Sequence, residues 1–158
     1  MRTKIIFGVI LALALLLTAS IPISAGPPDR TPHIYVGNVT YTINTPQAGM
    51  DTVYVSNIIW DNVRPHHIVV YLYSQTDGNT LGQQTSAPGG KDGKYPQYAD
   101  AYCVVPLGDG YFTYGAMVSV TVVLYDRKGN ALTQAVNVIS FTWHTANVSW
   151  MNTTPIDF

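Results

Sequence analysis

The chain has 158 residues and carries little charge: eight lysines and arginines stand against nine acidic residues, all of them aspartate. A formal net charge of −1 supplies no basic field for binding nucleic acid, and a hydrophobic content of 47% excludes a disordered chain. Glutamate, a good helix former, is absent, whereas the plentiful tyrosine, threonine and valine favour strands. An all-β protein is therefore expected.

Residues 1–25 have the layout of a secretory signal peptide. Two basic residues precede an uncharged apolar run over 5–17, and a stretch of small residues ends at Ala25, where we expect cleavage, with Ser20 as the alternative point. A retained membrane anchor and a pilin-like N-terminal helix compete with this interpretation. The run is at the short end for a membrane span, and the residue after Lys4 is not the small one usual at a pilin processing site. We predict a secreted, extracellular protein with no membrane contact once the signal helix is removed.

The rest of the chain is predicted to be a Pro-rich leader over 26–32 and a single domain over 33–158. The prolines of the leader prevent both helix and sheet pairing there. Strands are expected at 33–44, 51–61, 66–76, 80–85, 98–106, 117–126 and 131–143, with a last piece at 146–151. Seven to nine strands separated by Gly, Pro and Asp turns predict one β-sandwich, of immunoglobulin-like or jelly-roll topology.

Cysteine and histidine supply no metal or cofactor site. Cys103 is the only cysteine, so we expect a small buried hydrophobe, with an intermolecular disulfide as the alternative. His66 and His67 are adjacent at a strand start, where successive side chains point to opposite faces, so they are not expected to bind one ion together. We predict neither a metal nor a cofactor.

Aspartates in turns form a weak candidate calcium site. Asp92, Asp100 and Asp109, with Asp126, would converge if the loop over 86–97 folded over the neighbouring turns. Calcium prefers roughly six to eight oxygen ligands, and the chain has no Asp-x-Asp-x-Asp series. Turn geometry alone explains the Asp-Gly pairs.

The chain contains neither a Gly-x-Ser-x-Gly nor a His-Glu-x-x-His motif, and its glycines lack the spacing of a phosphate-binding loop. We therefore expect a protein that is not an enzyme. Three Asn-x-Ser/Thr sequons instead supply candidate glycosylation sites, at Asn38, Asn147 and Asn152.

Tyrosines gather between residues 86 and 115. Tyr95, Tyr98 and Tyr111, with Tyr102 and Tyr114 nearby, could stack on sugar rings, because tyrosine offers an apolar face with a hydroxyl at its tip. The competing interpretation is that they cover the core beneath a long loop.

The order of segments, with a signal, a Pro-rich leader, a first strand and a sandwich rich in Tyr, Thr and Asn, resembles that of extracellular filament subunits, in particular archaeal bundling pili built by donor-strand exchange. The resemblance covers the whole chain but lies in its layout, not in a motif. It implies that strand 33–44, with Tyr35, Val39, Tyr41 and Ile43 on one face, completes the sheet of a neighbouring copy. The alternative is that this strand pairs within its own domain.

We therefore expect a secreted, non-enzymatic structural protein: a self-assembling filament or cell-surface subunit whose partners are copies of itself. The near absence of charge from the strands supports this expectation, because isolated sandwiches commonly place charged side chains on their edges to prevent association. The alternative is a secreted carbohydrate-binding module that uses its loop tyrosines to bind surface glycans.

Overall fold

A computed structural model of the chain describes residues 29–44, 49–88, 97–106 and 110–156. The chain divides into two units, Met1–Arg30 and Thr31–Phe158, and all the strands belong to the second. The predicted signal peptide and residues 26–28 of the leader lie outside the described residues.

The described residues contain eight strands and no helix, which confirms the predicted all-β sandwich. The strands are β1 (His33–Thr42), β2 (Met50–Asp61), β3 (His67–Ser74), β4 (Thr80–Ser86), β5 (Gln97–Pro106), β6 (Met117–Tyr125), β7 (Ala131–Thr142) and β8 (Val148–Met151). Each expected strand is present to within a few residues at its ends, and the segment over 111–114 is a loop with turns.

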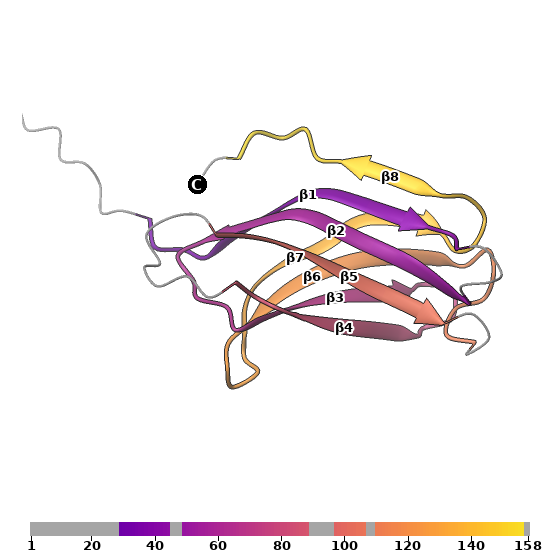
Figure 1. Ribbon diagram of the computed structural model, residues 1–158, viewed down its shortest axis with the longest axis horizontal. Helices are drawn as coiled ribbons and strands as arrows, with labels where there is room; N and C mark the ends of the chain where they lie inside the picture. The colour runs from indigo at the N-terminus through magenta and orange to yellow at the C-terminus, as the bar shows by residue number, and fades with distance from the viewer. Residues whose placement is uncertain (1–28, 45–48, 89–96, 107–109, 157–158) are drawn as a thin grey trace, which may run out of the picture. The chain divides into compact units, whose positions relative to one another are not determined.

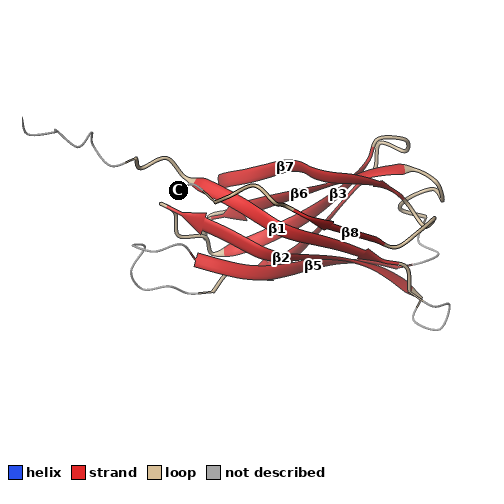
Figure 2. Ribbon diagram, turned by 90° about the horizontal axis from the view of Figure 1, so that it is seen from above, coloured by secondary structure: helices blue, strands red, loops and turns tan. Residues whose placement is uncertain are grey.

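The strands form two four-stranded antiparallel sheets, in the order β5-β2-β1-β8 and β4-β3-β6-β7 (Figures 1 and 2). We refer to them as sheet A and sheet B. The order in sheet B matches strands C′-C-F-G of an immunoglobulin-like sandwich, and β1, β2 and β5 match A, B and E. The strand order therefore selects the immunoglobulin-like topology over the jelly roll, with β8 added beside β1.

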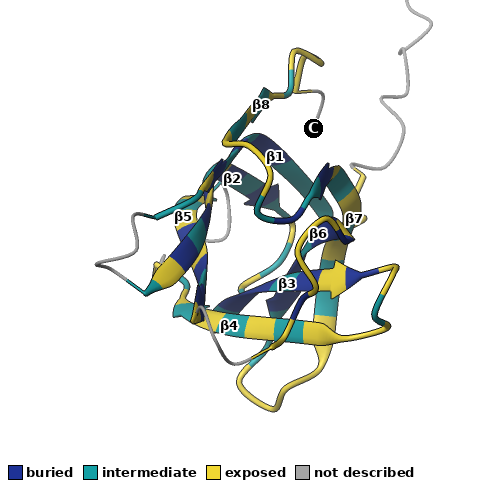
Figure 3. Cartoon of the chain, turned by 90° about the vertical axis from the view of Figure 1, so that its right-hand side faces the viewer, coloured by how far each residue is buried: buried dark blue, intermediate teal, exposed yellow. Residues whose placement is uncertain are grey.

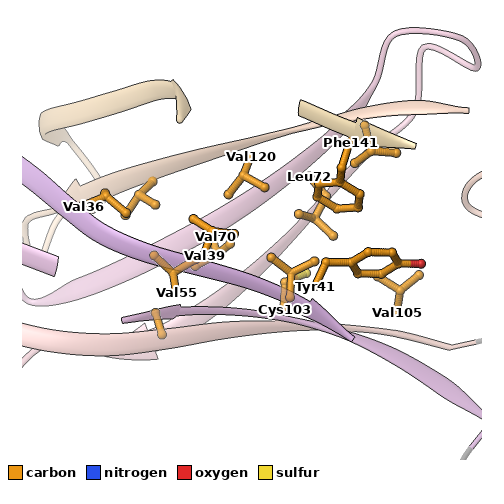
Figure 4. Packing of buried hydrophobic residues seen from close by; sticks show 14 of the residues in the cluster. Val36, Val39, Tyr41, Val55, Val70, Leu72, Cys103, Val105, Val120 and Phe141 are labelled. Atoms are coloured by element: carbon orange, nitrogen blue, oxygen red, sulfur yellow. The ribbon is translucent and has the colours of Figure 1, made fainter. Parts of the chain in front are cut away.

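The core lies between the inner faces of the two sheets, and Figure 4 shows side chains from both of them meeting there. Trp60, Trp143 and Tyr41 are among its largest fully buried side chains. Tyr41 stacks on Phe141 of the opposite sheet, with ring centroids 4.4 Å apart. Cys103 is also fully buried, and this burial raises the pKa of its thiol to about 12.

The alternation of core-facing and outward-facing residues in β1 and β2 is interrupted where Gly37 lies beside Asn57. Val39 and Val36 are both buried in the core, although strict alternation would place them on opposite faces. Asn57 has a positive φ of 55°, and the pairing of β2 with β5 shifts register between Val55 and Ile58. This irregularity corrects one expectation: Tyr35 does not share the core face of Val39.

The Gly37–Asn57 contact gives a stability prediction. A Cβ atom added at Gly37 would lie 2.6 Å from the Cβ of Asn57, so Gly37→Ala is expected to lower the free energy of unfolding by roughly 1–3 kcal/mol. Adding Asn57→Gly removes the opposing Cβ atom at a residue whose positive φ glycine tolerates. The double variant should therefore recover most of the loss in urea unfolding. Equal stability of the single variant and the native chain would contradict the prediction.

Candidate interaction surfaces

The first candidate surface is formed by the sheet edges, which are β5 and β8 in sheet A and β4 and β7 in sheet B. An edge strand presents a row of unpaired backbone groups that can pair with another chain, and proteins usually protect it with charge, proline or a bulge. β7 is twelve residues long and contains no charged residue or proline, and the shorter β4 and β8 contain none either. Only β5 carries such residues, at Asp100 and Pro106.

The core is incompletely covered along both edges of sheet B. Leu81 of β4 and Ala135, Val138 and Ile139 of β7 pack against the core but are only partly buried. Figure 3 shows exposed and half-buried residues along β4 and β7, whereas β3 between them is largely buried. A strand added at either edge would therefore bury apolar surface as well as pair backbone groups.

The two edges of sheet A are better protected, β5 by a side chain of β4 and β8 by its length of only four residues. In β5 the backbone N–H of Val104 donates to the side-chain Oε1 of Gln83, 2.8 Å away on β4. At the other edge, β8 pairs with residues 38–41 of β1. Asn152, which follows β8, donates hydrogen bonds to the backbone carbonyls of Gly37 and Val36 in the next part of β1. Protection is thus concentrated on sheet A.

A bulge partly protects β7. Asn137 has a φ of 50°, and its N–H donates to the hydroxyl of Thr121 at 3.2 Å. The pairing with β6 shifts register here, between Val120 and Val122. The bulge divides β7 into two segments, and no strand of the described residues pairs with the outer side of either.

The strand proposed for exchange, β1, is an inner strand of its own sheet. It pairs with β2 along nearly its whole length and with β8 on its other side. Val39 and Tyr41 are buried in the core, and Ile43 is partly buried against it. Tyr35 instead donates its hydroxyl to the carbonyl of Asn152, 3.0 Å away.

Tyr41 belongs to a buried polar network that the sequence did not indicate. The carboxylate of Asp51 is fully buried and accepts hydrogen bonds from the hydroxyl of Tyr41 at 2.7 Å and the N–H of Asn44 at 3.2 Å. His144 Nδ1 lies 2.8 Å from the same carboxylate. Burial and the adjacent Asp51 raise the pKa of Tyr41 well above its usual range. These bonds connect β1, β2 and the turn after β7.

The tyrosines considered for sugar stacking lie in two separate places. Tyr98, which is 74% exposed, and Tyr102 stand on the outer face of β5. Tyr102 is the cross-strand partner of Tyr54, a third exposed tyrosine, whose hydroxyl donates to Asp100. That bond raises the pKa of Tyr54. Alternation within β2 could have identified Tyr54, because it lies between two core valines.

Tyr111 and Tyr114 border a pocket of about 220 Å³. Buried Phe112 and Trp143 also line it, and Tyr114 stacks on His144 with ring centroids 4.2 Å apart. This leaves one face of the exposed Tyr114 ring free of His144. Tyr95, the remaining candidate, lies outside the described residues.

The segment carrying Tyr111 and Tyr114 is held by the turn after β3. Asp77 accepts hydrogen bonds from both the N–H and the hydroxyl of Thr113, at 3.0 and 2.7 Å, and from the hydroxyl of Ser74. Asn79 donates to the carbonyl of Tyr111. The bonds to Thr113 and Ser74 lower the pKa of Asp77.

The candidate calcium ligands are not assembled within the described residues. Asp100 accepts from Tyr54 and from the N–H of Asn57, and Asp126 accepts from the N–H groups of Lys128 and Asn130 in its own hairpin. Asp92 and Asp109 lie outside the described part of the chain.

The histidines require one correction. His66 precedes β3 instead of belonging to it, so the expected alternation does not apply, and its Nδ1 lies 3.2 Å from Nδ1 of His67. His33 pairs with Asp61, and His144 with Asp51. Among the described residues, no three His, Cys, Asp or Glu side chains are grouped so that they could hold a metal ion.

The three sequons differ in accessibility. Asn147 is exposed and accepts from the N–H of Ile43 through its Oδ1 atom. Asn38 is half-buried and donates to the hydroxyl of Ser56 at 3.4 Å. Asn152 uses both ends of its amide, donating to Val36 and accepting from Thr154. Asn147 is therefore the most accessible glycosylation candidate.

Comparisons with protein-family models, curated proteins and solved structures gave no match. Within the ranges described above, no helix is long and apolar enough to cross a membrane. The surfaces must therefore be interpreted from their own geometry.

Asp77 gives a pH prediction. Because its folded-state pKa is lowered, its contribution to stability is present above its unfolded pKa of about 3.9 and is lost as the pH falls through the folded value. Hydrogen exchange of the Thr113 amide should therefore accelerate at acid pH, beyond its intrinsic pH dependence. Asp77→Asn should remove this extra acceleration.

Asp126→Asn is the matched control, because the pKa of Asp126 is also lowered but by its own hairpin. This substitution should alter the stability of the protein at acid pH without changing how hydrogen exchange of the Thr113 amide depends on pH. If Asp77→Asn left the pH dependence of Thr113 amide exchange unchanged, the role assigned to Asp77 would be contradicted.

Proposed function

We propose that the chain is a secreted, non-enzymatic structural protein, a subunit of an extracellular filament or cell-surface layer that assembles with copies of itself by β-strand complementation. The observation that carries the proposal is β7, an edge strand of twelve residues with no charged side chain and no proline. Its Val136 side chain is 56% exposed. An uncharged edge of this length favours pairing with another chain.

The contributions of hydrogen bonding and apolar burial to the free energy favour association of copies. Each backbone hydrogen bond formed at an edge contributes roughly 0.5–1.5 kcal/mol, and apolar surface buried there adds about 25 cal/mol per Å². Ala135, Val138 and Ile139 supply partly exposed apolar surface on β7. The chain from Gly26 has six basic and nine acidic residues, so its net charge is −3 and repulsion between copies is modest.

Complementation has two possible routes. In the first, implied by the resemblance to donor-strand filaments, β1 of one copy would replace β1 of the next between β2 and β8. Val39 and Tyr41 would then enter a neighbour's core instead of their own. In the second, a strand is added to an open edge while β1 stays in place. The second route breaks no pairing of the single chain, and the geometry therefore supports it better.

Assembly is tested on the chain from Gly26 by sedimentation velocity at increasing concentration and by electron microscopy. We expect species larger than one chain whose proportion rises with concentration. Dithiothreitol should leave them intact, because the only cysteine, Cys103, is buried. A single chain at every concentration, together with native cell surfaces that carry no assembly of the protein, would exclude the proposal.

Carbohydrate binding is the second candidate function, and the exposed tyrosines of sheet A favour it. Tyr54, Tyr98 and Tyr102 share the outer face of β2 and β5, where flat rings could stack on a polysaccharide. On this candidate the protein would bind surface glycans through this face.

The candidate predicts binding to insoluble polysaccharides in a pull-down assay. Tyr98→Ala and Tyr102→Ala should each weaken it by up to about tenfold, since one aromatic stacking contact contributes about 0.5–1.5 kcal/mol. Tyr73→Ala is the matched control, because Tyr73 is 44% exposed against 46% for Tyr102 but lies on sheet B. Equal effects of all three substitutions, or no binding, would remove this candidate.

A further inference from the structure

The two open edges of sheet B run in opposite directions. β4 pairs antiparallel with β3, β3 with β6, and β6 with β7. Three successive reversals make β7 antiparallel to β4. A second copy placed beside the first in the same orientation therefore brings its β4 antiparallel to β7, and this continues the alternation of the sheet.

The two edge strands also lie at the same height along the strand direction. Following the pairing across the sheet, one row passes through Thr80, Tyr73, Ser119 and Ser140, and another through Thr85, Ile68, Leu124 and Thr133. Residues 80–85 of β4 thus lie opposite the section 133–140 of β7 in a neighbouring copy. No large sliding of one copy along the other is needed.

Apolar side chains at the two edges complement one another. Leu81 of β4 and Ile139 of β7 lie in the same row, through Leu72 and Val120, and both are only partly buried against the core. Placing β4 of one copy beside β7 of another would bring Leu81 next to Ile139. Each side chain would then cover the exposed part of the other.

We propose that β7 of one copy pairs with β4 of the next, so that sheet B continues from subunit to subunit. This inference rests on the proposed function and specifies its interface. The contact is heterologous, because two different edges meet and each copy keeps one edge free. Repetition therefore produces an open-ended filament instead of a closed dimer.

Pairing of two identical edges is less favourable. Two β7 strands would have to accommodate the irregularities of both copies, including the bulge at each Asn137, whereas β4 pairs with β3 without a register shift. Two β4 strands would leave Ala135, Val138 and Ile139 uncovered. In sheet A, Gln83 already occupies the N–H of Val104, so we assign the contact to sheet B.

A continuous sheet fixes the geometry of the filament. Each copy adds four strands, which at about 4.8 Å per strand gives a rise of roughly 19 Å per subunit. The usual twist of about 20–25° between neighbouring strands gives a rotation of roughly 80–100° per subunit. Helical reconstruction of the filaments measures both values.

The inference is tested with lysine substitutions at exposed positions of each edge. Val136→Lys/Ser140→Lys blocks β7, and Thr80→Lys/Gln84→Lys blocks β4. Each variant alone should stay monomeric in sedimentation velocity, whereas an equal mixture should form one-to-one dimers through the two native edges. Formation of the dimer also shows that both variants are folded.

Two controls accompany the test. Tyr73→Lys/Met117→Lys adds the same charge at exposed positions of the inner strands β3 and β6, and should assemble like the native chain. Thr42→Cys/Thr52→Cys, at paired positions of β1 and β2, should form a disulfide that prevents β1 exchange but leaves edge pairing intact.

The outcomes separate this inference from the proposed function. If the native chain stays a single chain at every concentration and native cell surfaces carry no assembly of it, both fail. If it assembles but the edge variants also form filaments, if the β4-blocked variant dimerises alone, or if the β1–β2 disulfide prevents assembly, only the β7–β4 interface is overturned. A filament rise far from that of four strands would overturn it as well.

Discussion

An antiparallel sheet that does not close on itself leaves two rows of unpaired backbone groups, and the organisation of this protein follows from where those rows lie. In sheet A, Gln83 caps the N–H of Val104 on β5, and Asn152 continues the cover of β1 beyond β8. In sheet B, no described strand pairs with the outer side of β4 or β7; both strands are uncharged, and both carry half-exposed apolar side chains. This difference between the sheets supports assembly through sheet B.

The buried network around Asp51 explains why β1 is firmly held in the single chain. Its carboxylate joins Tyr41 of β1 to Asn44 and His144, and Tyr41 also stacks against both Phe141 and Trp143. Removing β1 would leave a buried carboxylate without one of its donors, which is costly in a low-dielectric core. Edge addition avoids that cost, whereas strand exchange must restore the same contacts in another copy.

Much of the fold was predictable from local patterns. Alternating apolar residues and Gly, Pro and Asp turns located the strands, and the single cysteine was correctly expected to be buried. The faces of β1 were less predictable, because Gly37 and Asn57 interrupt an alternation that the residues alone suggest. The contact between His66 and His67 was missed for a similar reason: the strand begins one residue later than its pattern indicates.

The sequence by itself determined the all-β class, the approximate strands and the scarcity of charge, because each depends on residue type and on spacing within one segment. Only the tertiary structure decided which strands are edges, that β1 is an inner strand, and that Asp51, Tyr41 and His144 meet. These features depend on pairing between segments far apart in the chain, which periodicity within a segment does not encode. The uncharged residues of β4 and β7 acquire meaning for association because both strands lie at the outside of one sheet.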